Sequence, residues 1–251
     1  MRVARYLADG AAAYGVVDGP ELRVLAGHPL VNGYEYTGER VALKEVKLLA
    51  PTMPSKVVCI GKNYADHIAE FDGKAFDEPV VFLKPSTSII GPGESIVLPW
   101  QSERVDLECE LTVVIGSICK NVEPEDVGQY IWGYTVANDV TARDLQASDD
   151  QWARSKGFDT FLPLGPWIET EFEIDGQLIE SRINGETTQS ASVNDMIFGV
   201  AEIVSYVSKN MTLLPGDIVL TGTPAGVAQI KHGDIVECEV EGIGTLISHV
   251  L

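Results

Sequence analysis

Two glutamates and one aspartate are the residues of this sequence whose types and spacing best fit a chemical role. Glu108 and Glu110 lie two positions apart in the segment VDLECELTVVIG, and Asp139 follows the apolar segment GYTVAN. Residues two apart in a β-strand point to the same face and lie about 6.5–7 Å apart, so the glutamates can lean towards one cation. Carboxylate oxygens favour Mg²⁺, Mn²⁺ or Ca²⁺ over zinc. The spacing therefore predicts an all-oxygen site for a divalent cation.

An ordinary strand with one solvent-exposed face is the alternative explanation for the two glutamates, because alternating polar residues are common on half-exposed strands. Asp139 has an alternative of its own, since an aspartate before a helix often caps its N-terminus. Two features favour the cation site. The polar stretch stops at once, because Thr112 and Val114 follow the glutamates on the same face. Thr141 can cap the helix instead, which leaves Asp139 available as a third ligand.

Four polar residues are placed to assist such a site. Arg143 and Gln146 lie on one face of the predicted helix after Asp139, where a guanidinium and an amide suit a carboxylate and an adjacent oxo group. Lys156 follows that helix; near a cation its pKa falls and it can carry a proton, although lysine is also ordinary at a helix C-terminus. Thr223 lies in the loop LTGTPAGV, which either binds an anion or is a simple tight turn.

His67 and Glu70 form an i, i+3 pair in the segment NYADHIAEF, which is predicted to be a helix that ends near Asp72-Gly73. A carboxylate beside an imidazole orients the ring and stabilises its protonated form, as in a base that activates water. We therefore expect this pair to be the general base. An exposed histidine–glutamate pair without a role is the alternative.

The elements that must position these residues fall into two parts. Residues 1–50 contain short apolar runs separated by turn residues, which predicts a small β-rich unit with little room for a catalytic centre. Pro51 and Pro54 mark a join, so we expect a small N-terminal domain over residues 1–53 and a catalytic domain over residues 54–251. The second part is expected to be dominated by strands, with a few helices.

The strands of the second part are predicted from apolar runs and from alternation. In VDLECELTVVIG the odd-numbered residues from Val105 to Ile115 share one face, and Asp106 shares the other with the two glutamates. The further predicted strands lie in KVVCIG, PVVFLKPS, the two halves of IIGPGESIVLP, GYTVAND, GDIVLTGT and GDIVECEV.

Two further helices are predicted. TARDLQASDDQWARS begins with Thr141-x-x-Asp144, the pattern of a capping box. MIFGVAEIVSYVSKNMTLLPGD supplies the clearest amphipathic helix, because apolar residues recur three and four positions apart. The face expected to be buried consists of Ile197, Val200, Ala201, Val204 and Val207.

The bulk composition limits the class of protein. The 251 residues are 45% hydrophobic, and the net charge of -19 argues against nucleic acid or an anionic membrane as a partner. The sequence contains no apolar run of transmembrane length and no signal-peptide pattern, so a cytoplasmic location is expected. Four scattered cysteines predict reduced, buried thiols. The motifs GxGxxG, GxxxxGK[ST], GxSxG and HExxH do not occur.

Six segments together resemble the fumarylacetoacetate hydrolase family, in the order in which the family carries them. The similarity covers roughly residues 55–250. The matching motifs are GKNYADHIAEF, FLKPSTSIIGPG, DLECELTVVIG, YTVANDVTARDLQ, SKGFDTFLPLGPW and LTGTPAGV.

The resemblance implies an α+β, β-rich fold, a roll of mixed β-sheets in a sandwich, with residues 1–50 as the small N-terminal domain found in many bacterial members. It implies a homodimer or larger oligomer that binds Mg²⁺ or Mn²⁺ and acts on small 2-oxo or 2-hydroxydienoic acids, as in aromatic catabolism. The residues that match are, for the metal, Glu108, Glu110 and Asp139; for substrate contact and proton transfer, Arg143, Gln146, Lys156 and Thr223; and for the lid helix of members that cleave C–C bonds, His67 and Glu70.

The family includes hydrolases, isomerases and decarboxylases that share one metal platform, so fold and motifs do not select the reaction. The pair His67–Glu70 favours hydrolytic C–C cleavage of an acylpyruvate-type substrate, since isomerisation requires only proton transfer at carbon. The alternatives are a 2-hydroxyhepta-2,4-diene-1,7-dioate isomerase or an oxaloacetate decarboxylase. A non-catalytic module, in which the carboxylates only bind a metal or ligand, is the alternative from another class.

Overall fold

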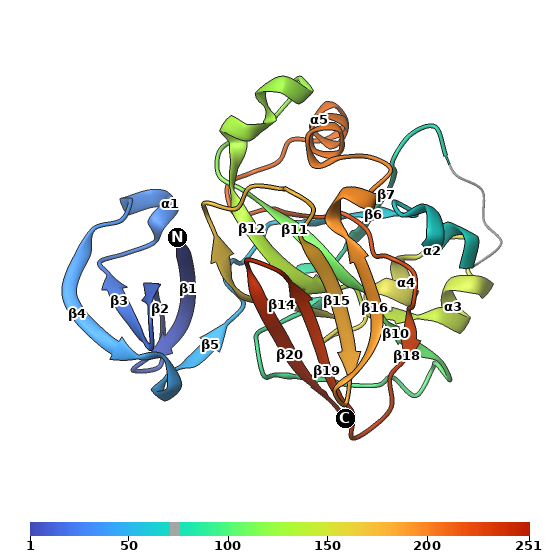
Figure 1. Cartoon of the computed structure of the whole chain (residues 1–251), viewed down its shortest axis with the longest axis horizontal. Helices are drawn as coiled ribbons and strands as arrows, with labels where there is room; N and C mark the ends of the chain where they lie inside the picture. Colours follow the sequence, from blue (N-terminus) through green and yellow to red (C-terminus); the bar gives the residue numbers. More distant parts are fainter. Residues whose placement is uncertain (71–75) are drawn as a thin grey trace.

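The N-terminal strands form a small curled unit to one side of the molecule, drawn in blue in Figure 1. The computed structural model describes residues 1–70 and 76–251. Alternating apolar residues of this unit enclose a small core around Ala4, Tyr6 and Leu22. Its elements are β1 (Arg2–Ala8), β2 (Ala11–Asp18), β3 (Glu21–Leu25), α1 (Pro29–Asn32), β4 (Tyr36–Ala42), the 3-10 turn Leu43–Glu45 and β5 (Lys47–Leu49).

The main sheet runs through both parts of the chain. Its strand order is β4-β3-β2-β1-β14-β12-β11-β17-β6-β7, with β5 beside β1 and β8 beside β14. The N-terminal unit is therefore joined edge to edge with the larger part, where Val3 pairs with Ile168. The strands of the larger part are β6 (Val57–Gly61), β7 (Val80–Lys84), β8 (Ile89–Ile90), β11 (Cys109–Ile115), β12 (Ile131–Asn138), β14 (Leu162–Glu169) and β17 (Ile218–Leu220).

A second sheet packs over β11, β12 and β14, and the largest apolar core lies between the two layers. Leu111 and Val136 of the main sheet meet Ile179, Val240 and Leu246 of the second sheet in this core. The β-rich α+β sandwich predicted from the sequence is confirmed. The strands of the second sheet, in order, are β16 (Glu186–Ser192), β15 (Leu178–Ile183), β19 (Ile235–Val240), β20 (Gly244–Val250) and β9 (Ser95–Ile96).

Helix α5 (Val200–Asn210) covers another part of the main sheet, together with the 3-10 segment Pro124–Tyr130. The inward positions that were predicted correctly are Val200, Val204 and Val207. Ile197 precedes the helix and Ala201 faces solvent, so these two predictions are wrong. The helix starts later than expected because the Gly199 N–H bonds to the Glu202 carboxylate at 3.0 Å, and Ile203 takes the buried position instead.

The predicted strand from Val105 to Ile115 is two strands that belong to different sheets. β10 (Val105–Leu107) pairs with β13 (Thr141–Ala142) and β18 (Ala228–Gln229) in a small third sheet, whereas β11 starts at Cys109 in the main sheet. The chain changes sheet at Glu108, so strand pairing on both sides overrides the continuous alternation. Every residue from Val105 to Ile115 is buried, which excludes the solvent-exposed strand considered above.

The helix predicted after Asp139 is also different in the structure. Thr141 lies in β13 and donates a hydrogen bond to the Asp139 carbonyl at 2.8 Å, so the proposed capping box is wrong. Asp144 instead accepts hydrogen bonds from the Ser102 hydroxyl and the Glu103 N–H. Two short helices follow, α3 (Arg143–Ser148) and α4 (Ala153–Lys156).

The remaining predictions of local structure are mostly confirmed. Helix α2 (Ala65–Glu70) has the expected start, and its predicted end near Asp72-Gly73 lies outside the described residues. The segments GDIVLTGT and GDIVECEV each begin with a Gly-Asp turn that leads into a strand. The glycines of these turns, Gly216 and Gly233, have the positive φ that glycine permits. All four cysteines are buried and free of disulfides. Within the described ranges, no helix has the length and apolar character that crossing a membrane requires.

Candidate active site

The three acidic residues meet because β11 and β12 are antiparallel neighbours. Cys109 at the start of β11 pairs with Asn138 at the end of β12, and the Asp139 N–H donates to the Glu108 carbonyl at 2.8 Å. Glu108, which precedes Cys109, therefore lies beside Asp139, which follows Asn138. Glu108, Glu110 and Asp139 are buried, and each contributes a carboxylate oxygen to a set in which all lie within 4.8 Å of one another.

The chemistry of this donor set fits a cation. Burial, and then the charges of Asp139 and Glu108, raise the pKa of Glu110 well above its ordinary value. The protein alone therefore opposes ionisation of Glu110, whereas a divalent cation between the three carboxylates would favour it. A buried acidic triad that could hold a metal ion is therefore present at the predicted position.

Two lysines and one arginine surround the triad. Lys156 contacts Asp139 at 2.6 Å and Glu108 at 2.8 Å, and Arg143 forms an ion pair with the other oxygen of Glu108. Lys84 donates to Asp139 at 2.6 Å and to the Val140 carbonyl at 3.2 Å. Burial would raise the pKa of Glu108, but Lys156 and Arg143 outweigh it and lower that pKa. The triad thus combines one strongly ionised carboxylate with one that resists ionisation.

Lys156 lies at the site, as the sequence predicts, although its surroundings disfavour loss of its proton. Burial would lower its pKa, but Asp139 and Glu108 raise it above the ordinary value. A role as a proton carrier therefore depends on the charge of a bound cation and stays a prediction. Lys84 was not predicted as a site residue, because strand alternation in PVVFLKPS cannot show which strand end reaches Asp139.

Arg143 and Gln146 lie together on α3, as predicted, and they interact with each other. Arg143 Nη1 donates to Gln146 Oε1 at 2.6 Å, which leaves the amide nitrogen of Gln146 as its donor towards a ligand. Arg143 also contacts β10, because its Nε donates to Asp106 at 2.8 Å. The pair presents donors of the kind that bind a carboxylate.

The loop after β17 binds anions that belong to the protein itself. The Gly222 N–H donates to Glu110 at 2.6 Å, and the Gly226 N–H lies 3.3 Å from both oxygens of Glu70. Thr223 lines the pocket, but its hydroxyl donates to the Cys109 carbonyl at 2.9 Å. The hydroxyl therefore can only accept from a ligand while this bond is kept, and its expected donation to a substrate carboxylate would require a change of partner.

Gln189 holds this loop in place and was not predicted from the sequence. Its amide donates to the Thr223 hydroxyl and to the Pro224 carbonyl, both at 2.7 Å, and its oxygen accepts from the Cys109 N–H at 3.0 Å. Gln189 is fully buried in β16. A single glutamine in a strand of mixed polarity carries no sequence signal that distinguishes it from a surface residue.

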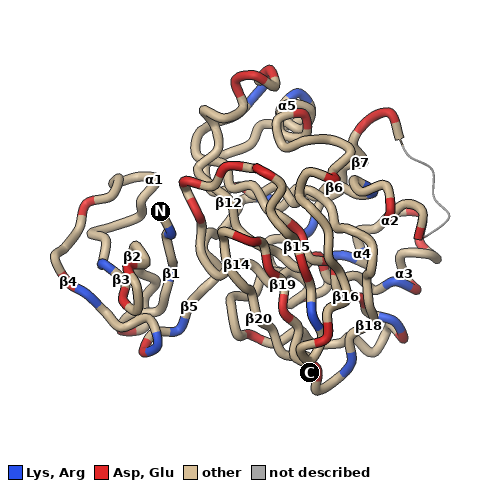
Figure 2. Tube along the Cα trace, in the orientation of Figure 1, with Lys and Arg blue, Asp and Glu red and all other residues tan. Residues whose placement is uncertain are grey.

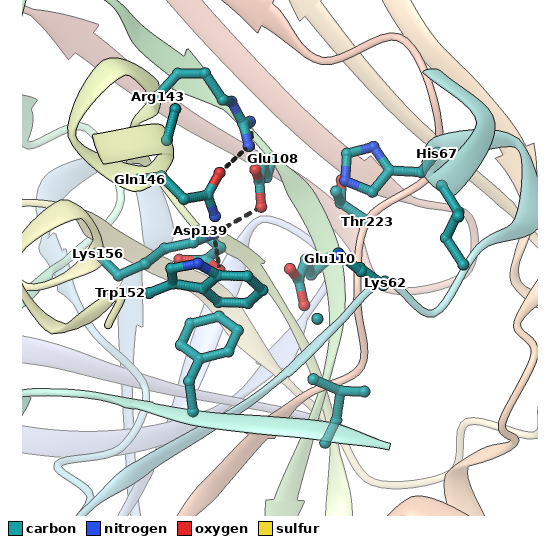
Figure 3. Close-up of a pocket in the computed structure, with 15 residues that line it drawn as sticks. Lys62, His67, Glu108, Glu110, Asp139, Arg143, Gln146, Trp152, Lys156 and Thr223 are labelled. Carbon is teal, nitrogen blue, oxygen red and sulfur yellow. Dashed lines mark hydrogen bonds and ion pairs between the residues drawn. The ribbon is translucent and has the colours of Figure 1, made fainter. Parts of the chain in front are cut away.

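His67 lies at the opposite side of the pocket from Arg143 and Gln146 in Figure 3. His67 Nδ1 lies 3.3 Å from Glu70 Oε2, so the predicted pair is formed. Burial lowers the pKa of His67, although Glu108 and Glu70 act in the other direction. Burial therefore favours the neutral form of the imidazole, and Glu70 connects His67 to the loop at Gly226.

These groups line one cavity of about 290 Å³. The apolar part of its lining includes Ile60, Ile68, Phe82 and Trp152. Trp152 lies so close to β6 that a Cβ on Gly61 would be 2.8 Å from its ring. The described residues of the predicted site that line the cavity are His67, Glu108, Glu110, Asp139, Arg143, Gln146, Lys156 and Thr223, and Glu70 is attached through His67.

The structure therefore combines a two-layer β-sandwich with a buried carboxylate triad that could hold a metal ion, in a pocket lined by both acidic and basic side chains. The model of the fumarylacetoacetate hydrolase C-terminal domain matches residues 56–251, and an Rv2993c-like N-terminal model matches residues 1–51. The chain belongs to the fumarylacetoacetate hydrolase family, which is a family of enzymes.

Relatives of this chain carry names that point to several reactions. Protein Rv2993c of Mycobacterium tuberculosis is 47% identical and covers 100% of this chain and 98% of its own. The mitochondrial oxaloacetate tautomerase Fahd2a of Rattus norvegicus is 45% identical over 82% of this chain and 70% of its own. The structure of a 2-hydroxyhepta-2,4-diene-1,7-dioate isomerase from Mycobacterium marinum superposes with a TM-score of 0.93, with 44% identity over 100% of this chain and 98% of that one.

Proposed function

We propose that this protein is a divalent-metal-dependent enzyme that isomerises small 2-oxo or 2-hydroxydienoic acids between their keto and enol forms. The observation that supports this reaction is the position of two proton-carrying groups, His67 and Lys156, on opposite sides of the carboxylate triad in one pocket (Figure 3). A proton can then be removed from carbon on one side of the substrate while the oxygen is protonated from the other side. The isomerase and tautomerase names of the relatives favour the same reaction.

Each group has a role that follows from its contacts. Glu108, Glu110 and Asp139 would hold Mg²⁺ or Mn²⁺, which when bound supplies a Lewis acid for an enolate oxygen. Arg143 and the amide nitrogen of Gln146 bind the substrate carboxylate. In the keto-to-enol direction His67, neutral and oriented by Glu70, takes the proton from carbon, and Lys156 gives a proton to the oxygen; in the opposite direction both transfers are reversed.

Hydrolytic C–C cleavage of an acylpyruvate is the second candidate. It is favoured by the His67–Glu70 pair, whose geometry at 3.3 Å also suits activation of a water molecule. The apolar part of the lining around Phe82 and Trp152 would exclude bulk water from the pocket. Both reactions start from a bound 2-oxo acid and pass through an enolate, so the pocket shape does not separate them, but the products do.

The test is a comparison of wild type and His67→Ala with three substrates. Oxaloacetate tautomerisation, ketonisation of a 2-hydroxydienoate and cleavage of an acylpyruvate are assayed with Mg²⁺, with Mn²⁺ and with EDTA. We expect metal-dependent tautomerisation or ketonisation in the wild type, reduced about 10²–10⁴-fold in His67→Ala. Cleavage as the fastest reaction would select the second candidate. If none of the substrates is turned over, the proposal fails in favour of a binding module without catalysis.

A further inference from the structure

Asp106 is a buried carboxylate next to the site that the roles above do not use. It lies in β10, two residues before Glu108, and its side chain is fully buried. Its Oδ2 accepts from Arg143 Nε at 2.8 Å, and its Oδ1 accepts from Arg104 Nε at 3.1 Å. Asp106 does not line the cavity. It therefore acts on the site through Arg143, which does line the cavity.

The contact with Nε determines where the rest of the Arg143 guanidinium points. The guanidinium is planar and its N–H groups have fixed directions, so fixing Nε restricts both terminal nitrogens. One of these nitrogens forms the ion pair with Glu108, and the other donates to Gln146 Oε1 at 2.6 Å. That last bond sets which end of the Gln146 amide is the donor towards the pocket.

We propose that Asp106 is a positioning residue for substrate binding, because it fixes the Arg143 guanidinium and, through it, the Gln146 amide. Without the buried carboxylate, the guanidinium can turn towards the remaining anions of the triad. The amide then loses the partner that selects its orientation. Affinity for the carboxylate of a 2-oxo acid falls, while the cation ligands keep their places.

The inference rests on the proposed binding of an oxo acid at Arg143 and Gln146, and it is tested by binding as well as by turnover. The probe is oxalate, a planar mimic of the enolate of a 2-oxo acid, titrated calorimetrically into the protein with Mg²⁺. For Asp106→Asn we expect the oxalate Kd to rise about tenfold. The Kd for Mg²⁺ alone should change less than about twofold, and KM should rise more than kcat falls.

A double-mutant cycle separates positioning from a general loss of structure. Lysine has no Nε–H to be fixed, so in an Arg143→Lys background the change Asp106→Asn should alter the oxalate Kd less than about twofold. Asp217→Asn is the matched control, because Asp217 is an equally buried carboxylate with an ion pair, to Lys56, outside the cavity. It should lower Tm and leave the oxalate Kd unchanged.

Two results would overturn the inference: an unchanged oxalate Kd in Asp106→Asn, or the same rise in both backgrounds. If Asp106→Asn does not fold, Asp106→Glu, which keeps the charge but displaces it by one methylene, is measured in the same two backgrounds with the same dependence on Arg143 expected. A wild type that binds no oxalate in the presence of Mg²⁺ would instead reject the proposed function.

Discussion

At the scale of single residues, the site is a balance of buried charges. Three carboxylates, two lysines and an arginine lie in contact, and each cation contacts at least one of the acids. Glu110 differs from the other two acids, because its carboxylate accepts a hydrogen bond from a backbone N–H, that of Gly222. It is the carboxylate whose charge the protein balances least, so a bound cation should affect it most.

A divalent cation should therefore stabilise the folded protein through Glu110. At a Mg²⁺ or Mn²⁺ concentration of about 100 times Kd, binding to the native state alone contributes about 2.7 kcal/mol. For a chain of this size, each kcal/mol corresponds to about 2–4 °C in Tm. We expect thermal unfolding followed by circular dichroism to show this rise in the wild type and to show none in Glu110→Gln.

The variant Asp217→Asn is a control for the cation experiment, since its carboxylate lies outside the triad. It should unfold at a lower temperature but keep the shift on adding Mg²⁺. An equal shift in Glu110→Gln and wild type would show that the cation binds elsewhere.

At the scale of elements, buried polar side chains fix the strands that carry the site. Asp217 lies in the turn before β17, and its carboxylate accepts from the Ser55 and Lys56 N–H groups at 2.9 and 3.2 Å, just before the parallel neighbour β6. At the far ends of the same strands, Asn63 donates to the Thr221 carbonyl at 2.7 Å. The pair β6–β17 is therefore held at both ends.

The contribution of Asp217 should depend on pH. Burial would raise its pKa, but hydrogen bonds from Lys56, the Leu214 N–H and Ser55 outweigh burial and lower it. A carboxylate with a lowered pKa in the folded state stabilises that state above its unfolded pKa of about 4, and this stabilisation is lost as the pH falls further. Asp217→Asn should cost about 2–3 kcal/mol at pH 7, where the carboxylate is ionised.

Urea unfolding at pH 7 and at pH 3 measures this difference. The gap in unfolding free energy between wild type and Asp217→Asn should narrow at the lower pH. A gap of the same size at both values would mean that the side chain contributes through packing rather than through its charge.

Much of this arrangement could be predicted from the sequence, and the rest has identifiable causes. Alternation in VDLECELTVVIG correctly predicted that the carboxylates of Glu108 and Glu110 lie close together, although Asp106, which it placed on the same face, lies outside the cavity. The change of sheet at Glu108 could not be predicted, since it depends on pairing with β13 and β18, which are distant in sequence. Lys84 and Gln189 were missed for the same reason, because their partners come from other strands.

At the scale of the whole molecule, charge is the dominant feature. Figure 2 shows acidic residues on the N-terminal unit as well as on the larger part, and the net charge is -19. Such a charge repels itself in the compact state. Exposed ion pairs such as Lys47–Glu94 offset little of this repulsion.

Salt should therefore stabilise the protein. Raising NaCl from about 0.01 M to 1 M shortens the Debye length from about 30 Å to about 3 Å and screens the repulsion between distant carboxylates. We expect Tm, measured with EDTA present, to rise by about 2–4 °C, or about 1 kcal/mol. KCl should act like NaCl. A fall in Tm would mean that the surface ion pairs outweigh the repulsion.

The pairing of β1 with β14 has a consequence for how the protein avoids aggregation. β14 borders the larger part of the main sheet, and two short partners share its outer side: β1 near Ile168 and β8 near Leu162. An uncovered strand of this kind is a template for the strand of another chain. The N-terminal unit therefore covers the outer side of β14 near Ile168 and moves the free edge of the sheet to β4, away from the strand ends that carry the carboxylate triad.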